Sequence, residues 1–146
     1  MSSNPSGSPR VVVDTNIILV ALTSHSRWYK VFEALREGAY TLVVSNDIIT
    51  EYAEKIFAKY DRLTAENFLR TLLVLPNVER QEIYFRWNLI PSDPDDNKFV
   101  DCAIASSADY LVSEDRHYNV LAGIEFPVVN VLRLAEFAER YIQNPA

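Results

Sequence analysis

Carboxylate side chains gather in four short segments of the chain: 11–16 (VVVDTN), 45–51 (SNDIITE), 93–97 (DPDDN) and 110–115 (YLVSED). In the first and last of these segments, an apolar run is followed by acidic residues. In open parallel sheets, ligands bind outside the carboxyl ends of the strands. Oxygen-only ligand sets select hard cations such as Mg²⁺ or Mn²⁺, which proteins hold with a few carboxylates plus water and substrate phosphate. A metal site at one edge of a sheet is therefore the first hypothesis.

The rest of the chain alternates between strand and helix patterns, which would position these segments. Apolar runs predict strands at 10–14, 40–44, 110–113 and 128–131, and 78–83 fits either a strand or an extended loop. Capping and periodicity signals predict helices at 16–22, from Ser24 or Ser26 to 35, at 45–60, at 64–75, from 93 onward and at 132–142. This alternation predicts a three-layer α/β/α fold with a mostly parallel central sheet. At 146 residues we expect one domain at 10–146, after a disordered Ser/Pro leader at 1–9.

The helix that begins near residue 93 carries an acid aimed at the core. At about 100° per residue, Asp96 lies on the same side as Val100 and Ala103, the face expected to pack on the sheet. Asp93 reads as the N-cap of this helix. Capping does not need a second, inward carboxylate, so Asp96 is the better candidate for chemistry.

Other polar residues of the same helix point elsewhere. Asn97 and Asp101 lie one turn apart along the flank of the apolar face, and either could support the site. Asp95 and Lys98 turn outward.

The remaining acids have simpler alternative roles. Glu51 points more than about 100° away from the apolar face of its helix, so periodicity alone makes it a surface residue. Asp14 and Asp115 each follow an apolar run and could simply cap the next helix. Two strand ends and one inward helix start would, however, converge on a single edge of the sheet.

Several classes of function are excluded or disfavoured. With three glycines, the chain has no GxGxxG, GK[ST] or GxSxG motif. His25 and His117 lack a second histidine or cysteine at ligand spacing, so zinc is disfavoured and each is expected at the surface or as a cap.

The net charge of −6 argues against an extended nucleic-acid surface, although two divalent ions would neutralise about four charges. Cys102 is expected in the core, and no apolar run reaches membrane-spanning length, so we expect a cytoplasmic protein.

The four segments, in this order and spacing, resemble the motifs of PIN-domain ribonucleases. The similarity covers the ordered chain and is strongest to the VapC toxins of toxin–antitoxin systems. It implies a small α/β/α domain that holds one or two Mg²⁺ or Mn²⁺ ions and hydrolyses RNA. It assigns Asp14, Glu51 and Asp115 to the family's acidic positions, with Asn16 as a polar supporter.

The third acidic position of the family is ambiguous here. Counting back from Asp115 without gaps places Asn97 where many relatives have an aspartate. The carboxylate must then come from Asp96 or from Asp101, and the helix geometry favours Asp96.

The resemblance also implies an RNA substrate, a small antitoxin and a homodimer. Lys98 and Arg116, and more remotely Arg27 and Trp28, are candidate substrate contacts. One stripe of apolar residues consists of Trp28, Val31, Phe32 and Leu35. It is either a contact surface for another protein or buried in the monomer.

Two other readings remain open. One is a receiver-like or phosphatase-like α/β protein, although Asn16 stands where a haloacid-dehalogenase-type phosphatase has its second aspartate. The other is a non-catalytic PIN-like module that docks a partner.

Overall fold

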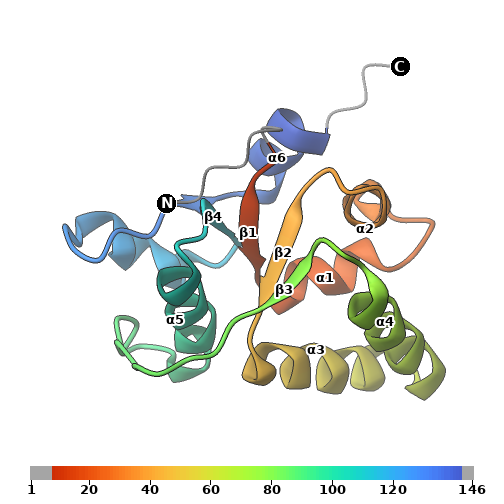
Figure 1. Cartoon of the computed structure of the whole chain (residues 1–146), viewed down its shortest axis with the longest axis horizontal. Coiled ribbons are helices and arrows are strands. Elements are labelled where there is room, and N and C mark those ends of the chain that lie inside the picture. The colour runs from red at the N-terminus through yellow and green to blue at the C-terminus, as the bar shows by residue number, and fades with distance from the viewer. Residues whose placement is uncertain (1–7, 143–146) are drawn as a thin grey trace.

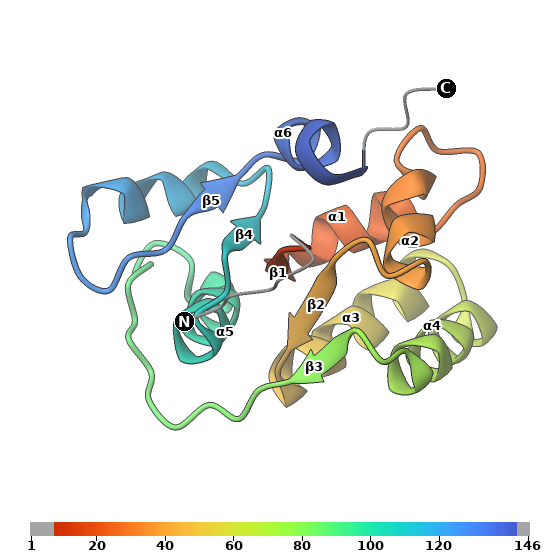
Figure 2. The same cartoon turned by 45° about the horizontal axis from the view of Figure 1, so that its top comes forward.

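The computed structural model describes residues 8–142 and has a five-stranded, entirely parallel sheet at its centre (Figure 1). The strand order is β3-β2-β1-β4-β5. The strands are β1 (Arg10–Val13), β2 (Thr41–Val44), β3 (Val78–Arg80), β4 (Tyr110–Val112) and β5 (Val131–Leu132). Helix α5 (Asn97–Ser106) lies on one side of the sheet, and α2 (Tyr29–Arg36) and α6 (Leu134–Phe137) lie on the other (Figures 1 and 2). The predicted three-layer α/β/α fold is confirmed.

The central strand explains why the acidic segments share one edge. Val11, Val12 and Val13 are fully buried, as expected for a strand covered on both faces. In register, Val11 pairs with Leu42 of β2, and Val13 pairs with Val112 of β4. Because all strands run the same way, the residues that follow β1, β2 and β4 emerge at the same edge.

The helices largely follow the predicted spans. The remaining ones are α1 (Thr15–Ala21), α3 (Asn46–Lys59), α4 (Arg62–Val74), the 3₁₀ turns η1 (Pro94–Asp96) and η2 (Arg116–Gly123), and the π turn η3 (Ala138–Ile142). Ser45 caps α3 by accepting a hydrogen bond from the backbone N–H of Ile48, as predicted. None of the helices within residues 8–142 is long and apolar enough to cross a membrane.

Several boundaries differ from the sequence analysis. Helix α4 begins earlier than Thr64, because Asp61 accepts the backbone N–H of Thr64 and caps it. The last strand is 131–132 rather than 128–131, and η2 was not predicted. Residues 1–7 of the expected leader and 143–146 lie outside the described residues. Pro9, also assigned to the leader, is buried, and its carbonyl accepts the backbone N–H of Thr41 at 2.9 Å.

The apolar stripe on α2 packs mainly inside the monomer. Val31 and Leu35 are 1% exposed, and Phe32 and Trp28 pack against the same core. Cys102 is also fully buried, as predicted. The core explanation of this stripe therefore accounts for it without a second chain.

The long segment between β3 and η1 is fastened to α5 by two polar side chains. Asn97 accepts the backbone N–H of Ile90 at 2.9 Å and donates to its carbonyl at 3.2 Å. Asp101 accepts the backbone N–H of Trp87 at 3.0 Å. Ile90 is fully buried, so its peptide groups depend on Asn97 for hydrogen bonds that water cannot supply.

We expect Asn97→Ala to lower the free energy of unfolding by about 1–3 kcal/mol, because it leaves buried peptide groups unsatisfied. Urea denaturation of the metal-free protein measures this. The matched control is Asn119→Ala, whose side chain is exposed on η2 and whose loss should have little effect. A change for Asn97→Ala no larger than that of the control would contradict this role.

Candidate active site

Asp14 follows the central strand directly and turns its carboxylate toward β4 rather than toward the next helix. Its backbone N–H donates to the carbonyl of Val112 at 3.0 Å, and its Oδ2 accepts from the hydroxyl of Ser113 at 2.7 Å. Its side chain makes no capping hydrogen bond to α1, all of which the structure describes. Capping therefore does not explain why an aspartate stands here.

The surroundings of Asp14 disfavour its charge. The residue is 6% exposed, and desolvation raises the pKa of its carboxyl above the usual value, with smaller contributions from Asp115 and Glu51. The Ser113 hydroxyl and, to a smaller extent, the backbone N–H of Thr15 lower the pKa and so oppose this rise. A buried carboxylate close to other acids is costly unless a cation compensates it.

Asp96 lies at the same edge of the sheet as Asp14 but comes from a different segment, η1. Asp93 caps η1, since its Oδ1 accepts the backbone N–H of Asp95 at 3.2 Å. Asp96 makes no side-chain cap to the described helix α5, and it is 7% exposed. Burial raises the pKa of Asp96 to about 6, helped by the charges of Asp93, Asp115 and Asp14. The burial of Asp96 thus agrees with the inward direction that was inferred from helix geometry.

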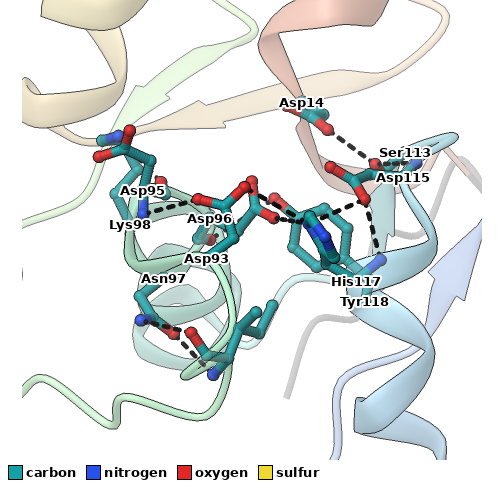
Figure 3. A network of polar contacts seen from close by, with 11 residues as sticks. Asp14, Asp93, Asp95, Asp96, Asn97, Lys98, Ser113, Asp115, His117 and Tyr118 are labelled. Atoms are coloured by element: carbon teal, nitrogen blue, oxygen red, sulfur yellow. Dashed lines mark hydrogen bonds and ion pairs between the residues drawn. The ribbon is translucent and has the colours of Figure 1, made fainter.

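Asp115 caps the following 3₁₀ turn and is also linked to Asp14. Its Oδ1 accepts the backbone N–H of His117 at 2.9 Å, so it caps η2. Its own backbone N–H donates to the Ser113 hydroxyl at 3.0 Å, the same hydroxyl that donates to Asp14. Ser113 therefore connects the acids that follow β1 and β4 (Figure 3).

His117 lies among these carboxylates, a position that its sequence spacing did not suggest. Its Nδ1 is 3.2 Å from Asp115 Oδ1, 3.3 Å from Asp96 Oδ2 and 3.4 Å from Asp93 Oδ2. Partial desolvation lowers the pKa of His117, but Asp115, Asp96 and Asp93 together raise it above the usual value. Figure 3 shows its ring between the segments that carry Asp96 and Asp115. Its place two residues after a strand-end acid was the signal available in the sequence.

Glu51 is held at the rim of the cluster. Its Oε2 accepts from the Thr15 hydroxyl at 2.5 Å, and its Oε1 lies 2.6 Å from Lys98 Nζ. Its side chain is 18% exposed, so the surface position suggested by helix periodicity is wrong. Lys98 was expected to turn outward, but its side chain is only 19% exposed, and its ammonium group also donates to the carbonyl of Asp95 at 2.9 Å. Thr15 and Lys98 belong to neighbouring elements, so the periodicity of the helix that carries Glu51 could not predict these contacts.

Four other candidates from the sequence are not among the residues of this cluster. Asn97 and Asp101 point to the segment before η1, and burial raises the pKa of Asp101. Arg116 is exposed next to Asp115. Asn16 is exposed and lines an apolar cavity of about 230 Å³ with Trp28.

The donor set fits a divalent cation. One ligand atom from each of Asp93, Asp96, Asp115 and His117 lies within 4.8 Å of the others. Asp14 is not one of these four, but its buried carboxylate is near enough to help raise the pKa of Asp96. Oxygen-rich sites of this kind suit Mg²⁺ or Mn²⁺. A bound cation would also compensate the charges that burial disfavours.

Comparison with known proteins agrees with this geometry. The family model for the PIN domain matches residues 10–117. The fold is similar to VapBC2 from Rickettsia felis, solved with a DNA fragment from its promoter, at 17% identity over 85% of this chain and 98% of that one, with a TM-score of 0.58. It is also similar to VapC20 from Mycobacterium tuberculosis, a sarcin-ricin loop cleaving toxin, at 12% identity over 78% of this chain and 95% of that one, with a TM-score of 0.56. No curated protein gives a significant match.

At such identities the solved structures establish a common fold, whereas the family match establishes descent. The matched span runs from the first residue of β1 to His117 and contains every acid of the cluster. This chain belongs to the PIN domain family and has a VapC-like fold.

Proposed function

We propose that this protein is a metal-dependent endoribonuclease and the toxin of a toxin–antitoxin pair. The main support is that Asp14, Asp96 and Asp115 come from three separate segments and lie near one another (Figure 3). Ser113 is hydrogen-bonded to both Asp14 and Asp115, and His117 Nδ1 lies 3.3 Å from Asp96 Oδ2 and 3.2 Å from Asp115 Oδ1. Helix capping accounts for Asp115 and Asp93 but not for Asp14 or Asp96. A PIN-family chain with buried, mutually repelling acids at this edge is best explained by a divalent metal centre.

Each residue of the cluster has a definable task in such a centre. Asp14, Asp96 and Asp115 would hold Mg²⁺ or Mn²⁺, with Glu51 at the rim. Such an ion, when bound by these residues, would supply the chemistry of water activation and charge neutralisation at the phosphodiester. Ser113 fixes Asp14 through its hydroxyl, and Thr15 fixes Glu51 in the same way. The exposed Arg116, which follows Asp115 in the chain, and Lys98, which pairs with Glu51, would meet substrate phosphates.

The proposal for partners and location is made by analogy with the family and the similar structures. The R. felis structure is a VapBC2 assembly on promoter DNA, and the M. tuberculosis protein cleaves the sarcin-ricin loop. By analogy this chain acts on RNA in the cytoplasm, is restrained by a small antitoxin and forms a homodimer.

Asp14→Asn should reduce RNA cleavage by about a hundredfold or more without unfolding the protein. Losing a residue that merely supports a metal ligand typically costs 10–100-fold, and Asn keeps the shape and the Ser113 contact. The assay is cleavage of pooled RNA with Mn²⁺ or with EDTA, alongside circular dichroism.

The control for this assay is Asp95→Asn, since Asp95 is exposed and should leave cleavage unchanged. Cleavage that persists in EDTA, or that Asp14→Asn leaves intact, would rule out the proposed mechanism.

Asp96→Asn should stabilise the metal-free protein at pH 7 and shrink its response to Mn²⁺. The pKa of Asp96 is about 6 in the fold against an ordinary 3.8. The folded state therefore binds more protons than the unfolded state between these values, and its stability falls as the pH rises through this window. The variant should lose less stability over the same range. Below about pH 4 the two proteins should melt at similar temperatures.

Thermal unfolding in EDTA and in Mn²⁺, at pH 4 to 8, tests this expectation. An ion that binds only the folded state stabilises it by about 2.7 kcal/mol at one hundred times Kd. Asp95→Asn should behave like the parent. If Asp96→Asn also melts like the parent at every pH, with the same gain from Mn²⁺, Asp96 is not a ligand.

A further inference from the structure

His117 is partly exposed, yet its position is fixed more closely than a surface histidine requires. Its backbone N–H is fixed by Asp115 Oδ1, and the next residue, Tyr118, is 1% exposed with its hydroxyl 3.5 Å from the carbonyl of Asp96. The backbone N–H of His117 and the side chain of the residue after it are thus held by the segments that carry Asp115 and Asp96. Although the side chain is 45% exposed, its Nδ1 faces the carboxylates instead of solvent (Figure 3).

We propose that His117 is a nitrogen ligand of the metal centre and gives it a preference for Mn²⁺ over Mg²⁺. This inference rests on the proposed metal-dependent function and specifies its cofactor. Asp96 and Asp115 would share the ion with His117, and Asp93 would lie beside it. In this respect the centre is not a purely carboxylate site.

The spacing of the ligand atoms supports the proposal. In octahedral coordination at about 2.1–2.2 Å, neighbouring ligand atoms lie about 3 Å apart. Nδ1 of His117 is 3.2–3.4 Å from one oxygen each of Asp115, Asp96 and Asp93. A small movement of the side chains would bring these atoms to the separation that one shared ion requires.

The chemistry of nitrogen ligands gives the expected selectivity. Neutral imidazole is the commonest metal-binding side chain and suits first-row transition metals. Mg²⁺ prefers oxygen and keeps much of its water. An imidazole in the ligand set should therefore strengthen Mn²⁺ binding and do little for Mg²⁺.

The same contacts allow a different role, in which a cationic His117 merely balances the acids. The two roles predict opposite effects of removing the ring. If His117 is a ligand, removing its ring weakens Mn²⁺ binding. If it is a competing cation, removing its ring makes Mn²⁺ bind more tightly. The sign of the change in affinity separates them.

The test uses the full chain, with Mn²⁺ and Mg²⁺ as probes. Calorimetry measures both affinities in the parent, in His117→Ala and in the control His25→Ala, whose side chain is exposed in the turn between α1 and α2. Pulsed electron paramagnetic resonance of Mn²⁺ bound to the parent detects nitrogen coupling directly and needs no variant.

We expect ¹⁴N coupling in the parent, its loss in His117→Ala, and Mn²⁺ binding weakened about tenfold or more, with a smaller change for Mg²⁺ and none in His25→Ala. Bound Mn²⁺ without nitrogen coupling, or affinity that is unchanged or increased in His117→Ala, would overturn the inference while leaving the nuclease proposal standing. If the parent binds neither ion and its RNA cleavage persists in EDTA, both proposals fail.

Discussion

Electrostatic repulsion among carboxylates at one edge of a parallel sheet is the constraint around which this molecule is arranged. Asp14 and Asp96 are more than nine-tenths buried, and burial together with neighbouring acids raises the pKa of each. Such a cluster opposes folding unless a cation compensates it, so its presence points to binding rather than to stability. The polar groups around it fit this interpretation, because Ser113, Thr15 and Lys98 each engage an acid and fix its direction.

The scaffold supplies the rigidity that such a site requires. Asp14 follows the central strand, and Ser113 joins it to the acid that follows β4. Asp96 immediately precedes α5, a helix that holds the incoming segment through Asn97 and Asp101. These two residues were site candidates from the sequence, but their hydrogen bonds fasten the segment before η1 to the helix. Sites supported on strands and helices in this way keep their geometry better than sites on loops.

The sequence predicted what depends on local periodicity and missed what depends on contacts between distant segments. Valine-rich β1, the inward direction of Asp96 and the capping by Ser45 all follow from neighbouring residues. Glu51 appeared to be a surface residue because its partners, Thr15 and Lys98, lie 36 and 47 positions away in the chain. His117 appeared isolated because only the fold brings Asp96 to it. The resemblance to PIN-domain ribonucleases identified the family correctly, yet by itself it could not show how Glu51 is held.

If Asp14, Asp96 and Asp115 bind one metal centre together, the ion should be visible in a crystal structure of the protein soaked in Mn²⁺, with anomalous diffraction measured at the manganese edge. We expect an anomalous peak within about 2.0–2.4 Å of oxygens from at least two of these three residues. Crystals of RNA-cleaving protein that show no peak at this edge of the sheet, or a peak only at unrelated acids, would contradict it.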